Sequence, residues 1–546
     1  MGCRPSTCTR LLMTNPATDR RSNRRSLLDN NDRMCLSCAY GPMQRLRAVQ
    51  STLDFIGRDD RIRTCDPLTP SQVRYQAAPH PDRTESISFA PGAGRGRVFL
   101  MNDAQRRVSF VAPLVVLIAA LGQTPKAQVT RSPSVAPPIV ITNTTVVDVI
   151  AGGRTPGMTV VVREGRIEQI GRRIAVPRGA LRVDGAGKFL IPGLWDMHSH
   201  NQASGVESLD LFVANGVVGT RDMGSDLDFI LPLRDRIRRN ELLGPEIVAA
   251  GPILDDAPPE WPFRRRVTNA EDAREAVRDL KNRGVDFIKV HNNTPREAFF
   301  AIADESLKLG LPFAGHIPLK VTIEEGISSG MKSIEHLSES RIFRECPGKG
   351  AYSAARCQPI FESIAAKGVW QTPTGAFYQL IPDVFSGKPF PNEEYATDRA
   401  LELNRANIKA ANLDERTLAI LRSQNATRLT AVHDLLSSGA RFLAGCDAWV
   451  PGFCLHDELQ WLTEAGLSPL QAIQTATINA ARFLEREKDQ GTVETGKRAD
   501  LTLLEGDPLV DIHNTRRVAA VVVRGRLLSR TEIDRMVAAR RRRARP

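Results

Sequence analysis

Two histidines and an aspartate alternate in one short apolar stretch of the sequence. The stretch reads Asp196-Met197-His198-Ser199-His200. Side chains of an extended chain alternate between two faces, so Asp196, His198 and His200 share one face. Two imidazoles on one face are a common arrangement of metal ligands. A later apolar run carries Lys289, and three others end at His316, His336 and Asp447.

These residue types predict a site for a divalent metal ion, with zinc as the expected ion. Neutral imidazoles and a carboxylate are typical ligands of zinc and similar ions. The ammonium of Lys289 would repel such a cation, but carboxylation by carbon dioxide would make it an anionic carbamate able to bridge two ions. A hydroxide between two ions would be a nucleophile at neutral pH. Asp447 would hold one ion and carry the proton to the leaving group, so Asp447 and Lys289 are the predicted catalytic residues.

The sequence also predicts the elements that bring these residues together. Short apolar runs alternate with amphipathic stretches through residues 193–487, which predicts an α/β protein with a (β/α)8 TIM-like barrel. The carboxyl ends of the strands in such a barrel meet at one mouth. A helical insertion is expected at about 391–439. The eight runs are 194–198, 217–221, 246–251, 285–291, 311–316, 332–336, 369–372 and 441–447.

A second pattern, typical of β structure, precedes and follows the predicted barrel. Residues 136–192 contain short runs rich in β-branched residues, with a hairpin turn expected at Glu164-Gly165. The pattern returns within residues 488–530. We therefore expect a small composite β-sandwich domain, built from both ends of the chain, into which the barrel is inserted.

Residues 1–100 differ from the rest and precede a predicted signal peptide. They hold 16 Arg, no Lys and no sustained apolar periodicity, so disorder or a wrongly assigned start is expected. Residues 101–127 contain Arg106-Arg107, then an apolar run too short to span a membrane comfortably, then small residues. This order predicts an exported protein, periplasmic or extracellular, with no membrane span after cleavage of the signal.

The net charge of +12 lies at the two ends of the chain, because residues 101–529 are neutral overall. Residues 531–546 are expected to form a solvated basic tail. A nucleic-acid partner is not expected, since the basic residues do not belong to the body of the protein.

Taken in order, the motifs resemble those of the amidohydrolase superfamily of metal-dependent hydrolases, and within it the imidazolonepropionase-like and prolidase-like members. The resemblance runs from about Pro138 to Leu527. One departure is Cys446, where the family usually has Thr or Ser, and a small buried residue is expected there. The motifs are Ile191–His200, Gly216–Gly224, Asp286–Val290, Ala314–His316, Ile334–His336, Leu443–Asp447, Gly491–Val493 and Gly496–Asp500.

The resemblance implies two divalent ions, with carbon dioxide bound as a lysine carbamate. It implies His198 and His200 as ligands of one ion. It implies His316 and His336 as ligands of the second. Lys289, carboxylated, would bridge the two ions, and Asp447 would complete the first site and act as acid or base.

Three further residues are candidates for substrate binding. His291 follows Lys289 by two residues, so it should point the same way and line the pocket or replace a ligand. Arg221 ends the second run, where it would contact substrate or form a structural ion pair. His456 follows the eighth run, near the expected mouth.

The predicted function is an exported, metal-dependent hydrolase that cleaves the amide bond of dipeptides or N-acyl amino acids through a metal-activated hydroxide. The alternatives among enzymes are a cyclic-amide hydrolase and a mononuclear deaminase. Outside enzymes, a non-catalytic binding protein on the same scaffold is the alternative. The expected partner is a small amide or dipeptide, and a homo-oligomer is left open. Export would permit a disulfide between Cys346 and Cys357.

Overall fold

The structure is a computed structural model that describes residues 136–257, 262–346 and 352–541. The expectations for residues 1–100 and for the signal peptide at 101–127 lie outside the described residues. The last part of the predicted tail, 542–546, also lies outside them.

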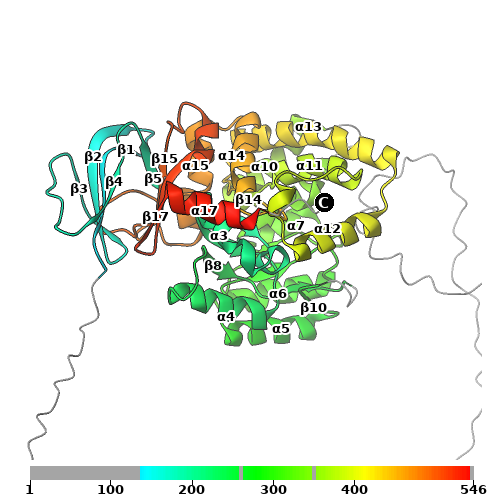
Figure 1. The fold of residues 1–546 in the computed structure, drawn as a ribbon. Coiled ribbons are helices and arrows are strands. Elements are labelled where there is room, and N and C mark those ends of the chain that lie inside the picture. The colour runs from blue at the N-terminus through cyan, green and yellow to red at the C-terminus, as the bar shows by residue number, and fades with distance from the viewer. Residues whose placement is uncertain (1–135, 258–261, 347–351, 542–546) are drawn as a thin grey trace, which may run out of the picture. The chain divides into compact units, whose positions relative to one another are not determined.

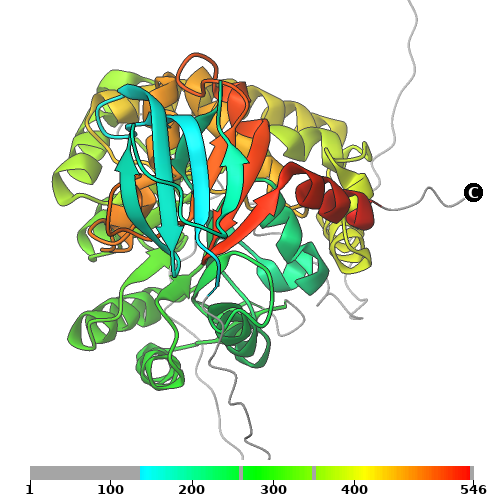
Figure 2. The same ribbon diagram turned by 60° about the vertical axis from the view of Figure 1, so that its left-hand side comes forward.

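One sheet of eight strands combines both ends of the described chain, so the cyan and red strands lie side by side in Figure 2. Its order is β17-β16-β15-β5-β1-β2-β3, with β4 paired to β1. The predicted hairpin is confirmed, because β2 and β3 pair antiparallel around Glu164-Gly165. The strands are β1 (Ile139–Val147), β2 (Arg154–Arg163), β3 (Arg166–Gly171), β4 (Leu181–Asp184), β5 (Phe189–Pro192), β15 (Leu501–Leu504), β16 (Val518–Val523) and β17 (Arg526–Ser529).

Parallel strands alternate with helices between the two parts of this sheet. One parallel sheet has the order β6-β7-β8, and another has the order β10-β9-β11-β12-β13-β14. Seven of the eight predicted runs contain one of these strands, whereas β9 and β10 were not expected. The strands are β6 (Leu194–Ser199), β7 (Val217–Asp222), β8 (Glu246–Ala249), β9 (Ile253–Asp255), β10 (Arg264–Arg266), β11 (Ile288–Val290), β12 (Phe313–Gly315), β13 (Ser333–Glu335) and β14 (Trp370–Thr372).

The helices lie around these parallel strands in Figure 1. In α5, Asn269 accepts from the first backbone amides and Gly284 ends the helix in the left-handed conformation. The predicted helical insertion is confirmed by α12 and α13. The main helices are α3 (Leu209–Ala214), α4 (Leu227–Arg238), α5 (Ala270–Arg283), α6 (Arg296–Lys308), α7 (Ile323–Ser328), α10 (Ala354–Lys367), α11 (Gly375–Phe385), α12 (Asp398–Ala411), α13 (Glu415–Ser437), α14 (Phe453–Glu464), α15 (Pro469–Thr475), α16 (Ile478–Phe483) and α17 (Arg530–Arg540).

Shorter turns complete the described chain: α2 (Asn201–Ser204), η1 (Val206–Ser208), α8 (His336–Glu339), α9 (Arg341–Arg344), η2 (Glu393–Tyr395) and η3 (Ile512–Arg516). Within the described ranges, no helix has the length and apolar character needed to cross a membrane.

The eighth predicted run is an extended segment rather than a regular strand, so this prediction is wrong in its detail. Phe442 makes only an isolated bridge to Gln371 in β14. On the other side, Met197 in β6 donates its backbone N–H to Ala444 O at 2.9 Å. The segment therefore lies between β14 and β6. Gly445 permits this close approach, since a Cβ there would lie 2.6 Å from the Cβ of His198.

The first part of the predicted tail is helix α17, so it is not a solvated tail. Ser529 caps this helix with Glu532 in a capping box, and Ile533 is buried. Arg540 forms an ion pair with Asp210, 2.9 Å apart. The apolar residues of α17 are few and lie among arginines, so the sequence gives only a weak helical pattern there.

Two disulfides link neighbouring segments. Cys346 is bonded to Cys357, the pair that export would permit. Cys446 is bonded to Cys454, a pair that no pattern in the sequence predicts. The second bond ties the residue before Asp447 to the start of α14.

Candidate active site

Three predicted metal ligands lie around the carboxylate of Asp447: His198 in β6, His200 directly after β6, and His336 directly after β13. His198 Nε2 and His200 Nε2 lie 3.7 and 3.4 Å from Asp447 Oδ1. His336 Nε2 lies 3.6 Å from Asp447 Oδ2. His316, which follows β12, joins the group because its ring lies 4.9 Å from that of His336 between centroids. The four predicted histidine ligands and Asp447 thus form one cluster.

All four histidines use the same ring nitrogen for a hydrogen bond within the protein. In each case the Nδ1–H donates to an oxygen, since a carboxylate, amide or backbone carbonyl can only accept. The hydroxyl of Thr374 also accepts here, because it already donates to Pro373 O. The Nε2 atoms of His198, His316 and His336 are therefore left with their lone pairs, and His200 Nε2 faces Asp447. The acceptors are Glu335 for His198 (2.8 Å), Gly224 O for His200 (3.3 Å), Asn292 for His316 (2.9 Å) and Thr374 for His336 (2.6 Å).

Burial favours the neutral form of three of these rings. It lowers the pKa of His198, His316 and His336 well below the ordinary value of 6.5, and the charge of Lys289 adds to the effect. A neutral imidazole is the form that binds a metal ion.

His200 differs, since it is the most exposed of the four. Burial lowers its pKa, but the hydrogen bond and charge of Asp447 outweigh burial, so the pKa of His200 is raised. A positive charge beside Asp447 is therefore favoured, and a metal ion would supply it in place of this proton.

The spacing of the donors around Asp447 is that of ligands of divalent cations. Ligand atoms that each lie about 2.1 Å from one tetrahedral ion are about 3.4 Å apart. The three separations from imidazole nitrogen to Asp447 oxygen are 3.4, 3.6 and 3.7 Å. His198, His336 and Asp447 offer ligand atoms within 4.8 Å of one another. The residues thus fit a divalent ion in both type and distance.

Lys289 in β11 reaches the same cluster from a buried position. Its side chain is only 2% exposed. Burial lowers the pKa of this amine to about 8, although the charges of Glu335 and Asp447 act in the opposite direction. Among the described residues, no carboxylate oxygen lies within 4.0 Å of its Nζ. The amine is thus close to the cluster without a carboxylate partner.

Of the three candidates for substrate binding, only His291 lies beside the cluster with some exposure. Its ring stacks on that of His316, with centroids 4.0 Å apart. Its Nδ1 lies 3.7 Å from Asp255 Oδ2, and its side chain is 17% exposed. Its Nδ1 has no hydrogen-bond partner. These positions suit a residue that lines the substrate space.

Arg221 is fully buried behind the histidines, where it forms the structural ion pair rather than a contact with substrate. Its Nη2 donates to both oxygens of Glu335, each at 2.9 Å. The same carboxylate accepts the Nδ1–H of His198. The expectation of a direct substrate contact is therefore corrected, because the guanidinium is 0% exposed.

His456 lies in α14, outside the cluster. Its Nδ1 lies 3.0 Å from Thr515 Oγ1 and its Nε2 lies 3.1 Å from Asn215 O. Both ring nitrogens are thus satisfied by residues remote from Asp447. Burial lowers the pKa of His456 to about 3, so the ring is neutral. The expectation that it lies near the mouth is corrected to a structural role.

Two residues that sequence reasoning missed lie beside His316 and His336. Glu339 Oε1 is 3.5 Å from His316 Nδ1, and its side chain is 24% exposed. Tyr378 in α11 donates its hydroxyl to Glu339 at 2.5 Å. Glu339 belongs to a turn of five consecutive left-handed residues, 336–340, with φ between 49° and 70°. Strained backbone of this kind is concentrated at functional sites.

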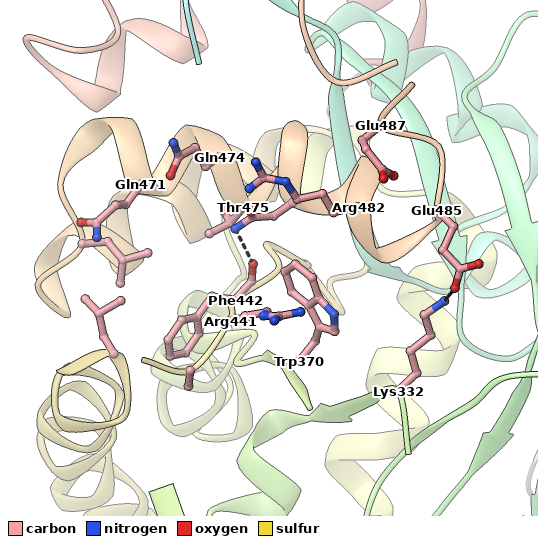
Figure 3. A pocket seen from close by; sticks show the side chains of 14 residues that line it. Lys332, Trp370, Arg441, Phe442, Gln471, Gln474, Thr475, Arg482, Glu485 and Glu487 are labelled. Atoms are coloured by element: carbon pink, nitrogen blue, oxygen red, sulfur yellow. Dashed lines mark hydrogen bonds and ion pairs between the residues drawn. The ribbon is translucent and has the colours of Figure 1, made fainter. Parts of the chain in front are cut away.

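A separate cavity of about 720 Å³ lies away from these residues (Figure 3). Lys332 and Trp370, two of its lining residues, stand at the amino ends of β13 and β14. The metal-ligand candidates follow the carboxyl ends of their strands. This cavity therefore belongs to the opposite end of the parallel strands.

Comparison with known proteins identifies the family to which these motifs correspond. The model described as "Amidohydrolase family" matches residues 189–528. The chain is 22% identical over 418 residues to the ochratoxinase of Aspergillus niger, which covers 64% of this chain and 78% of the relative. It is 23% identical over 424 residues to the imidazolonepropionase of Mycolicibacterium smegmatis, covering 72% and 96%.

One solved structure is similar over most of the described chain. It is a Xaa-Pro dipeptidase with bound methionine in its active site, at 20% identity and a TM-score of 0.57. The match covers 72% of this chain and all of the dipeptidase. At this identity the likeness establishes an α/β fold of the same kind.

Proposed function

Because the chain belongs to the amidohydrolase family, and is therefore a hydrolase of carbon–nitrogen bonds, we propose that it cleaves the amide bond of dipeptides or N-acyl amino acids with the help of divalent metal ions. The observation that carries this proposal is the cluster of four histidines and Asp447, in which every histidine uses its Nδ1 for a hydrogen bond within the protein and keeps its Nε2 for a ligand bond.

The residues divide between two ions, for which zinc is the proposed metal. His198, His200 and Asp447 would hold the first, and His316 and His336 the second. Lys289, carboxylated by carbon dioxide, would be the ligand shared by both. When bound, the ions supply Lewis acidity toward the amide carbonyl and lower the pKa of water.

The chain's own residues do the remaining work. Asp447 is 19% exposed, so its carboxylate can both hold a cation and accept or return a proton at the substrate space. Lys289 is suited to carboxylation, because burial brings the pKa of its amine to about 8 and the neutral amine is the form that reacts with carbon dioxide. His291 lines the space beside His316 and would contact the substrate.

The substrate class is supported by the relatives rather than fixed by them. A Xaa-Pro dipeptidase and an ochratoxinase are among the similar proteins, and Lys289 favours the two-metal members of the family. An imidazolonepropionase is also among them, so a cyclic amide is the second substrate class to test.

The proposal extends to the fold and to the site of action. The two parallel sheets and the 441–446 segment between β14 and β6 support one closed (β/α)8 barrel, with the eight-stranded sheet as a separate composite domain. Two disulfides support export, since such bonds persist in oxidising compartments.

Metal content per chain and turnover of a dipeptide and N-acyl amino acid panel test the proposal. We expect close to two zinc ions per chain after growth with zinc and bicarbonate. Asp447→Asn should lower kcat by about 10²-fold or more while the protein stays folded. The control is His456→Gln, which changes a buried histidine outside the cluster and should leave kcat near that of the parent protein.

Other outcomes have clear meanings. One ion per chain, unaffected by Lys289→Ala, would favour the single-metal alternatives, a deaminase or a cyclic-amide hydrolase. Full activity in Asp447→Asn would contradict a catalytic role for this cluster.

A further inference from the structure

Arg221 crosses the interior of the parallel strands and contacts three other strands. It lies on β7. Its Nε donates to Met197 O of β6 at 2.6 Å, and its Nη1 donates to Ser333 Oγ of β13 at 2.7 Å. Its Nη2 donates to Thr372 Oγ1 of β14 at 3.2 Å. One side chain thus links the strands that carry His198 and His336.

The charge of Arg221 is matched by one carboxylate. Both oxygens of Glu335 lie 2.9 Å from Arg221 Nη2, and both side chains are 0% exposed. A buried ion pair is tolerated when both partners are present, but removal of one leaves an uncompensated charge in a low-dielectric interior. Ser333 also donates to Glu335 Oε1 at 2.6 Å. The carboxylate therefore has a fixed orientation.

Glu335 in turn orients the predicted metal ligand His198 through a hydrogen bond. Its Oε2 accepts the Nδ1–H of His198 at 2.8 Å. This bond keeps the proton on Nδ1 and directs the Nε2 lone pair toward Asp447. His336 directly follows Glu335 in the chain, so the same carboxylate lies next to a ligand of the second ion.

We propose that Arg221 is a positioning residue of the metal centre, which acts through Glu335 to set the tautomer and aim of His198 and holds β6 and β13 at the spacing that both ions require. The proposal rests on the proposed function, because it assumes that His198 binds a metal ion. Arg221 itself does not touch the substrate.

The test is a double-mutant cycle read out by zinc affinity. Affinity is measured by competition with a chelator on metal-free protein, without the need for a substrate. We expect Arg221→Met to weaken zinc binding by about 10- to 100-fold, the usual effect of losing an outer partner of a metal ligand. In Arg221→Met with Glu335→Gln, the uncompensated anion is gone and the amide oxygen can still accept from His198. This double variant should regain most of the lost affinity.

A control separates positioning from simple loss of stability. Arg234 is another buried arginine, with its Nη1 2.9 Å from Asp286 Oδ2, but it lies on α4 away from the cluster. Arg234→Met should lower thermal stability and leave zinc affinity unchanged. Arg221→Lys, which keeps the charge but not the forked hydrogen bonds, serves as the second variant if Arg221→Met does not fold, and it should weaken zinc binding as well.

Two results would overturn the proposal. One is zinc affinity within twofold of the parent protein in Arg221→Lys and Arg221→Met. The other is failure of Glu335→Gln to restore affinity in the Arg221→Met protein. If the parent protein itself binds no zinc in the chelator competition, the proposed function is contradicted. The inference about Arg221 then fails because its premise, a metal ion bound by His198, is absent.

Discussion

The Nε2 atoms of three histidines face the carboxylate oxygens of Asp447, and one proton cannot form a hydrogen bond with all of them. His198 and His336 carry their protons on Nδ1, so their Nε2 lone pairs point toward other lone pairs. Acceptors that face each other at 3.6 to 3.7 Å repel unless a cation lies between them. A cation at the centre of the arrangement removes this repulsion, which supports a metal ion at this position.

The proposed carboxylation of Lys289 has a definite pH dependence. Because the pKa of the amine is lowered to about 8, the neutral amine becomes the major form only above that pH. At a fixed concentration of dissolved carbon dioxide, recovery of metal-free protein with zinc should be faster at pH 9 than at pH 6.5, roughly thirtyfold by the fraction of neutral amine. Time courses of regained activity measure this rate.

The matching control is Lys289→Met, which should show no dependence on carbon dioxide at either pH. A rate of recovery that is independent of carbon dioxide in the parent protein would contradict the carbamate.

At the level of segments, the Cys446–Cys454 disulfide restrains the loop that presents Asp447. Asp447 has a φ of 57°, in the left-handed region that aspartate and asparagine adopt more readily than other non-glycine residues. The disulfide closes a short loop directly beside this residue. It therefore restricts the other backbone conformations that Asp447 would otherwise adopt.

Replacing both cysteines of this pair by serine should lower kcat and also lower the free energy of unfolding by about 2–3 kcal/mol. The control is the same replacement of Cys346 and Cys357, which close a loop of similar length. That control should lose stability with little change in kcat. Equal effects of the two pairs on kcat would show that the first disulfide has no special relation to Asp447.

Much of the site could be predicted from sequence, because its ligands follow the carboxyl ends of strands that are themselves legible as apolar runs. His198, His200, His316, His336 and Asp447 were found in this way. The partners of these ligands were not. Arg221 meets Glu335 across 114 residues, and no local pattern encodes that contact.

Other features escaped prediction for similar reasons. Strand β10 consists of three arginines, so it gives no apolar signal, and only three residues separate β9 from the end of β8, within the same apolar stretch. His456 follows the eighth run in the sequence, but its position in α14 turns it toward Thr515. The pairing of Cys446 with Cys454 depends on the loop between them, and cysteine counts alone do not determine it.

For the molecule as a whole, the composite sheet and the parallel strands are joined at Gly216. Its φ is +75°, and a Cβ there would lie 2.7 Å from Thr502 Cγ2 in β15. The hydroxyl of Thr502 donates to Gly216 O at 3.1 Å. This contact connects the start of β7 with the C-terminal part of the sheet.

Gly216→Ala should therefore destabilise the protein by about 2 kcal/mol or more, from the positive φ and from the clash together. Gly284→Ala is the control, because its φ is +83° and no atom lies within 4 Å of the added Cβ. Urea unfolding should show the larger loss for Gly216→Ala. Equal losses of unfolding free energy in the two variants would mean that the contact between Gly216 and Thr502 adjusts to the added methyl group without destabilising the protein.

The shared sheet also has a consequence for the order of synthesis. β5 pairs with β15, and Leu190 pairs with Leu503. This pairing cannot form until about three hundred intervening residues have been synthesised. Until then β5 has a free edge, and the strands from 139 to 192 cannot complete their core. The N-terminal part of such a nascent chain therefore stays unfolded for longer than a domain whose strands are all adjacent in the sequence. If the protein is exported, as proposed, delayed closure would keep the chain unfolded for longer before it crosses the membrane.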